Sequence, residues 1–195
     1  MAAADRNEQV RILRALAQIG GDAAAEGFVL GLRSSARRVR EVAIKGSVPL
    51  LHHPSIVAQL VATAQNSNEK PKLRHAALSA LCGQTFGGPF AALPAEAATA
   101  LVPFIENPTT RSHVTLCLAC LPLSPEMKKL LQRVIAIGTA EEAALARRTL
   151  AGEKVVNLGK FDDEAERRHI AQTNDPAAGR VFFWVQRQEQ SHQSA

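Results

Sequence analysis

The segment that decides the fold is residues 39–51, which read VREVAIKGSVPLL. It places an apolar residue and an arginine ahead of small and apolar residues at helical spacing. The pattern begins also at Val10-Arg11 and at Leu73-Arg74, so that the arginines recur after 29 and 34 residues. Weaker copies at residues 114–121 and 143–150 keep the small and apolar positions but lack the arginine. The chain therefore repeats a helical unit.

A second helical segment follows each of the first four copies, after a short turn. These segments open with helix-entry signals: an aspartate, a serine, or a proline in the first turn. One pair of helices cannot bury its apolar face alone, whereas stacked pairs share a continuous core. About five helix pairs are expected. The second helices are predicted at residues 24–32, 55–64, 94–105 and 125–137.

The composition agrees with an all-α chain. Alanine, which loses no side-chain freedom in a helix, supplies 34 of the 195 residues, and aromatic residues make up only 4%. Three cysteines are too few and odd in number for a disulfide framework. No stretch of about 20 apolar residues predicts a membrane span, and residues 1–6 carry no secretory signal. A cytoplasmic location is therefore expected, or a periplasmic one if the chain is a fragment of a cytochrome-linked protein.

The repeated pattern resembles the short bacterial HEAT repeat, whose helix reads VRxxAxxAL, over roughly residues 7–152. The resemblance implies a right-handed α-α superhelix (an α-solenoid) over residues 1–156. Residues 157–195 are then a charged helix with an aromatic tail. HEAT units often carry an aspartate about three residues before the valine, which builds a polar ladder between repeats. Here those positions are Asn7, Ala36 and Lys70, so we expect the ladder to be weak or absent.

The resemblance also implies that the arginine-bearing helices line the concave side. These segments carry a formal charge of +7 in total, and the alternate segments carry −2. We therefore predict a basic ridge that attracts an acidic protein surface. Nucleic acid is a less favoured partner, because these helices hold no aromatic residue to stack on bases. The alternative is that the charges only solvate the helices and the repeated arginine serves packing. The ridge comprises Arg11, Arg14, Arg37, Arg38, Arg40, Lys45, Lys72, Arg74 and His75.

Two motifs contain residue types that can bind a metal ion or take part in redox chemistry. Cys117 and Cys120 form a CxxC, but with Leu121 they take the places of Ala77, Ala80 and Leu81 in the preceding repeat. We therefore expect them to be buried as small hydrophobic residues. The pair His52-His53 precedes a proline, and neither cysteine nor carboxylate joins it at a useful spacing. A loop or cap role is expected, and no metal site is predicted.

Acidic pairs do not require a catalytic explanation. Glu141-Glu142 follows a helix-entry threonine, where negative charge favours the helix dipole. The run Asp162-Asp163-Glu164 opens the charged helix of the tail. No nucleophile elbow, phosphate loop or HExxH motif is present in the sequence. We therefore predict a non-enzymatic interaction scaffold with no cofactor and no catalytic residues.

The tail carries a second, shorter resemblance. Residues 174–183 resemble the entry of a c-type cytochrome domain, but no cysteine follows them, so haem cannot attach there. One alternative function is therefore an accessory or truncated segment of a periplasmic electron-transfer protein. A further alternative is a bilin-lyase-like HEAT protein. The apolar residues Val181, Phe182, Phe183 and Trp184 are expected to cap the solenoid or to bind a partner. The Gly/Pro-rich loop at residues 84–94 is a second candidate contact.

Overall fold

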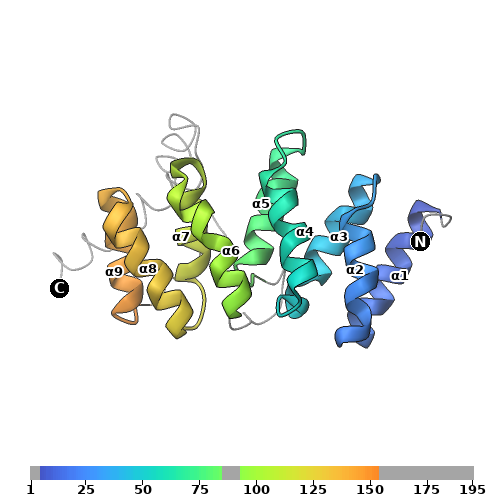
Figure 1. Cartoon of the computed structure of the whole chain (residues 1–195), viewed down its shortest axis with the longest axis horizontal. Helices are drawn as coiled ribbons and strands as arrows, with labels where there is room; N and C mark the ends of the chain where they lie inside the picture. Colours follow the sequence, from blue (N-terminus) through green and yellow to red (C-terminus); the bar gives the residue numbers. More distant parts are fainter. Residues whose placement is uncertain (1–4, 85–92, 154–195) are drawn as a thin grey trace, which may run out of the picture. The chain divides into compact units, whose positions relative to one another are not determined.

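The protein is all-helical in the computed structural model, which describes residues 5–84 and 93–153. Within these ranges it forms nine α-helices, two short 3-10 helices and no strand (Figure 1). The 3-10 helices are η1 (Asp22–Ala24) and η2 (Val48–Leu50). The α-helices are α1 (Arg6–Ile19), α2 (Ala25–Leu32), α3 (Arg37–Gly46), α4 (Pro54–Gln65), α5 (Pro71–Leu81), α6 (Ala95–Glu106), α7 (Pro108–Ala119), α8 (Pro125–Ile137) and α9 (Ala140–Leu150).

Within the described residues the helical segments predicted from the sequence are confirmed, with one difference, and the charged helix predicted in the tail lies outside these residues. Residues 39–51 do not form one continuous helix, because α3 ends at Gly46 and the 3-10 helix η2 follows. Pro49 explains the break, since proline donates no backbone hydrogen bond and its ring clashes with the preceding turn. None of the helices in the described ranges is both long and apolar enough to cross a membrane.

Helix starts follow local sequence signals. Proline occupies the first turn of α4, α5, α7 and α8, where its missing N–H costs nothing. Asn107 caps α7, and Ser124 caps α8 by accepting a hydrogen bond from a backbone N–H. At α9 the caps are reciprocal: the Thr139 hydroxyl accepts from the Glu142 N–H, and the Glu142 carboxylate accepts from the Thr139 N–H.

The chain divides into two compact units, Met1–Leu101 and Val102–Ala195, with the boundary inside α6. In the first unit α3 lies against both α1 and α5, while α2 lies against α4. The two sets of helices therefore form two layers. Between them lie fully buried side chains such as Phe28 and Leu60. At Gly46 the ring of Phe28 packs so closely that an added Cβ would collide with it.

Within the first unit, α1, α3 and α5 run in the same direction. The first residues of α1 and α3 line one surface depression together. Arg40, in the first turn of α3, forms an ion pair with Glu69, just before α5 begins. Neighbouring helices whose first turns adjoin in this way are parallel. The three arginine-bearing helices of this unit therefore form one layer with a common orientation.

In the second unit α9 packs against both α7 and α8. The N-terminal halves of α7 and α9 are joined by the hydrogen bond from the Ser112 hydroxyl to the Glu142 carboxylate, at 2.6 Å. These two helices are therefore also parallel, and α8 connects them. Leu118, Leu131 and Leu145 are fully buried in this unit.

The fourth copy of the repeat was predicted to lack the arginine, and that prediction is wrong. Arg111 lies in the first turn of α7, as Arg74 lies in the first turn of α5, 37 residues earlier. With that alignment, three buried residues of α5 correspond to three residues of α7 that are also buried. Ala77, Ala80 and Leu81 match Val114, Cys117 and Leu118, respectively. The predicted register was three residues too late, because the pattern alone did not show where the preceding loop ended.

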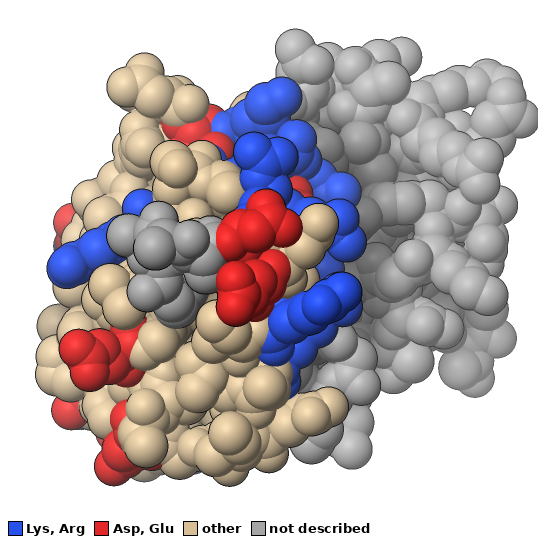
Figure 2. All heavy atoms as spheres, turned by 90° about the vertical axis from the view of Figure 1, so that its right-hand side faces the viewer, with Lys and Arg blue, Asp and Glu red and all other residues tan. Residues whose placement is uncertain are grey.

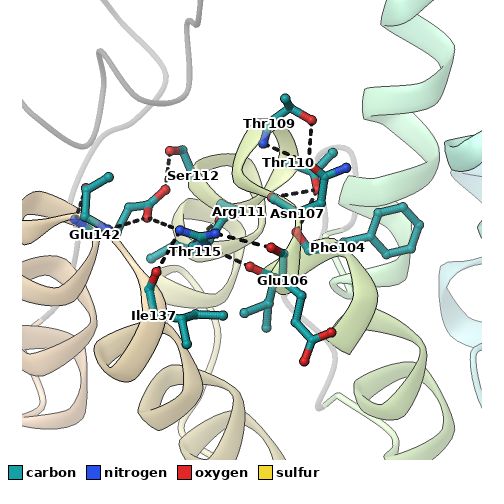
Figure 3. A network of polar contacts seen from close by, with 12 residues as sticks. Phe104, Glu106, Asn107, Thr109, Thr110, Arg111, Ser112, Thr115, Ile137 and Glu142 are labelled. Atoms are coloured by element: carbon teal, nitrogen blue, oxygen red, sulfur yellow. Dashed lines mark hydrogen bonds and ion pairs between the residues drawn. The ribbon is translucent and has the colours of Figure 1, made fainter.

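Arg111 is buried at the centre of a polar network (Figure 3). Its Nε donates to the carbonyl of Ile105 at 2.7 Å, and its Nη2 to that of Glu106 at 3.3 Å. Its Nη1 donates to the carbonyl of Ile137 at 2.9 Å and lies 3.6 Å from the Glu142 carboxylate. The carbonyls belong to the last turns of α6 and α8, where the helix dipole favours a cation.

The polar ladder between repeats was expected to be weak or absent, and the described residues contain two separate ion pairs between neighbouring repeats. Arg40 of α3 pairs with Glu69 ahead of α5, and Arg111 of α7 pairs with Glu142 of α9. The acidic partner is thus a glutamate on the next repeat. The absence of aspartate at Asn7, Ala36 and Lys70 did not exclude it.

We predict that Arg111→Ala lowers the free energy of unfolding by about 3 kcal/mol, because it leaves a buried carboxylate and helix-end carbonyls without their partner. The measurement is urea unfolding followed by circular dichroism. The control is Arg133→Ala, since Arg133 forms an exposed ion pair with Glu106, and it should cost less than about 1 kcal/mol. Equal stability of the two variants would contradict the structural role of Arg111.

Candidate functional site

Seven of the nine predicted ridge residues are exposed. They lie on α1, α3 and α5, the parallel helices of one layer in the first unit. Arg37 makes an exposed ion pair with Glu41 of its own helix at 3.0 Å, so that its charge is locally compensated. The exposed members are Arg11, Arg14, Arg37, Arg38, Lys45, Lys72 and His75.

The other two members serve packing, the alternative role raised by the sequence. Arg40 is half-buried, and its Nη1 donates to the carbonyls of Ser34 and Ser35 at 2.8 and 2.9 Å. Arg74 is half-buried as well, and its Nε donates to the carbonyl of Ala64 at 3.1 Å, in the last turn of α4. Arg111 makes the same kind of contact in the second unit. The surface that can meet a partner therefore excludes Arg40 and Arg74.

An open depression of about 900 Å³ lies beside the first turns of α1 and α3. Arg6, Arg37 and Arg38 line it together with Asp5 and Glu41. The ridge is thus extended at one end by Arg6, which is not among the predicted ridge residues. Figure 2, which views the N-terminal end, shows Lys and Arg atoms gathered in a band with acidic atoms in its middle.

The cysteines lie in surroundings that suit packing. Cys82 and Cys117 are buried, and Cys120 is half-buried at the end of α7. Burial, and next the neighbouring Cys117, raises the pKa of the Cys120 thiol to about 11. At neutral pH this thiol is protonated, so it is neither a strong nucleophile nor a ready metal ligand.

The histidine pair has a carboxylate partner that linear spacing did not reveal. His52 and His53 precede α4, and both Nε2 atoms lie within hydrogen-bond distance of one oxygen of Asp22, at 2.9 and 3.0 Å. His53 is the N-cap residue of α4, but its side chain makes no capping hydrogen bond. The expected cap role is therefore filled only by its backbone position.

Two predicted contacts lie mainly or wholly outside the described residues. Of the loop at residues 84–94, the structure describes only residue 84 and residues 93–94. The predicted boundary at residue 157 and the apolar tail Val181, Phe182, Phe183 and Trp184 lie beyond residue 153. These remain predictions from the sequence.

We predict that Arg74→Ala lowers the free energy of unfolding by about 1 kcal/mol, because the carbonyl at the end of α4 loses a charged donor. Lys72→Ala, two residues away on the exposed side of α5, should change stability by less than about 0.5 kcal/mol. Thermal and urea unfolding of both variants measure the difference. A larger loss from the lysine variant would refute the packing role of Arg74.

A second prediction concerns acid titration. The hydrogen bond from His52, and next that from His53, lowers the pKa of the Asp22 carboxyl. Asp22 therefore contributes stability that is present above its unfolded-state pKa and disappears as the pH falls through the lower, folded-state pKa. Carbon-13 NMR titration of the Asp22 carboxyl should show a depressed midpoint that rises in the His52→Ala/His53→Ala variant. An unchanged midpoint would show that the histidines do not hold the carboxylate.

No protein-family model, no curated protein and no solved structure matches this chain with significance.

Proposed function

We propose that the chain is a right-handed α-solenoid of HEAT-like helix pairs, and that it works as a non-enzymatic scaffold which binds an acidic protein surface. The binding surface is the exposed basic ridge of α1, α3 and α5, defined by Arg11, Arg14, Arg37, Arg38, Lys45, Lys72 and His75. The observation that carries the proposal is that seven basic side chains are exposed on three alternate helices, α1, α3 and α5, which pack side by side.

The solenoid is supported by the same rule of packing in both units. In each unit, helices two apart in the chain run side by side, and an arginine in the first turn reaches a carbonyl at or beyond the end of the preceding helix. A rule that repeats from neighbour to neighbour is typical of repeat proteins, in which each unit contacts the next.

Binding rather than catalysis is supported by the character of the ridge. Its charges are spread over three helices and open to solvent, where long-range attraction steers an oppositely charged partner. Among the described residues the ridge offers no aromatic platform for bases, because the buried Phe28 and Phe104 are the only described aromatic residues besides histidine. This favours an acidic protein segment over single-stranded nucleic acid.

The test measures binding of fluorescently labelled polyglutamate to the full chain by fluorescence anisotropy at low and high salt. We expect binding that weakens as salt increases. The variant Arg37→Glu/Arg38→Glu/Lys45→Glu should bind at least about tenfold more weakly, because it reverses three charges in the middle of the ridge. The packing arginines Arg40 and Arg74 stay unchanged, so their hydrogen bonds to backbone carbonyls are not removed.

The matched control is Lys128→Glu/Lys129→Glu/Arg147→Glu, which reverses three exposed charges of α8 and α9 and changes the net charge equally. It should bind polyglutamate within about twofold of the unaltered chain if the site is local. An equal loss of affinity in both variants would show that binding depends on net charge and not on the ridge. Tighter binding of an oligonucleotide than of polyglutamate at the same salt would refute the protein partner.

A further inference from the structure

Three side chains of the types that bind metals come together on the surface of the first unit, and none of them is a ridge residue. Asp22 is the first residue of η1, between α1 and α2, while His52 and His53 lie between η2 and α4. The two stretches are thirty residues apart in the chain. One potential ligand atom from each side chain lies within 4.8 Å of the other two. Elsewhere in residues 5–84 and 93–153, no three His, Cys, Asp or Glu side chains come together in this way.

The separations match those around a metal ion. Ligand atoms at about 2.0–2.2 Å from a first-row transition metal stand about 3 Å apart when they are adjacent in its coordination shell. The Asp22 oxygen lies 2.9 Å from the His52 Nε2 and 3.0 Å from the His53 Nε2. The ligand atoms of all three side chains lie within 4.8 Å of one another, so an ion can take the place of the two hydrogen bonds once the three side chains turn toward it.

The donor set selects the kind of ion. Two imidazole nitrogens with one carboxylate oxygen suit zinc and its neighbours better than magnesium or calcium, which prefer oxygen ligands alone. An aspartate carboxylate is ionised at neutral pH, so Asp22 supplies negative charge to the ion. The centroids of the His52 and His53 rings are 4.3 Å apart, and the two ring planes are tilted by 41° relative to each other.

We propose that Asp22, His52 and His53 form a surface site for one divalent transition-metal ion of the zinc class, with solvent filling the remaining positions. The Asp22 and His52 side chains are 76% and 53% exposed, so the ion stays open to exchange and to an outside ligand. Binding joins the α1–α2 turn to the connection before α4, and it therefore braces two successive helix pairs. The site is independent of the basic ridge.

In the test, zinc chloride is titrated into the metal-free, tag-free full chain, and the heat of binding is measured by calorimetry. We expect one zinc ion per chain. Asp22→Asn, His52→Ala and His53→Ala should each weaken zinc binding by at least about tenfold, because each removes one of three protein ligands. Zinc should raise the melting temperature of the unaltered chain more than that of each variant.

The matched control is His75→Gln/His169→Gln/His192→Gln, which removes three of the other four histidines and leaves the site intact. It should retain zinc binding within about twofold. The helical content of every variant is checked by circular dichroism, so a folding defect is recognised. Should a variant misfold, paramagnetic cobalt(II) locates the site in the unaltered chain, since it should broaden the NMR signals of Asp22, His52 and His53 first. Zinc affinity that survives in all three site variants, or cobalt broadening centred elsewhere, would overturn the proposal.

Discussion

The structure depends on one interaction: an arginine in the first turn of a helix donates hydrogen bonds to carbonyls at or beyond the end of the preceding helix. A helix leaves its last four carbonyls without partners inside the helix, and its dipole makes that end negative. Arg74 meets this need at α4, and Arg111 meets it at both α6 and α8. A guanidinium suits the task because its N–H groups form a rigid fork and its charge is permanent.

The same arginines also explain how one helix pair is joined to the next. Arg40 and Arg111 each reach forward to a glutamate at the beginning of the next repeat, while they hold carbonyls behind them. The same side chain therefore fixes a helix against its predecessor and its successor. Since these arginines are committed to packing, the proposed binding surface consists of the basic residues that remain exposed. The basic residues of the first unit are thus of two kinds: those that pack against the ends of helices and those that remain exposed. The sequence pattern alone does not distinguish them.

Most of the described helices could be predicted from the sequence because their signals are local. Proline at the first position, a serine or threonine cap and a repeated apolar spacing fixed the position of each helix to within a few residues. The register of α7 could not be predicted in this way, because the length of the preceding loop hid the correspondence between Arg74 and Arg111. The glutamates that pair with arginine were missed as well, since Glu69 and Glu142 do not occupy the familiar aspartate position.

The candidate sites show the same division between local and long-range information. The exposure of Arg11 and Arg38 followed from helical spacing, whereas the roles of Arg40 and Arg74 depend on where the preceding helix ends. Asp22 could not be linked to His52 from the sequence, because the contact joins turns of two different helix pairs. A contact of this kind can be predicted only when the repeats are aligned and their turns are compared.

The most direct measurement is the hydrogen-exchange rate of the arginine Nε–H groups, observed by nitrogen-15 NMR. Because Arg74 and Arg111 donate their Nε–H to helix-end carbonyls, the account predicts slow exchange at these two positions and fast exchange at the exposed Arg38. Exchange at Arg74 and Arg111 that is as fast as at Arg38 would contradict the interaction on which the structure depends.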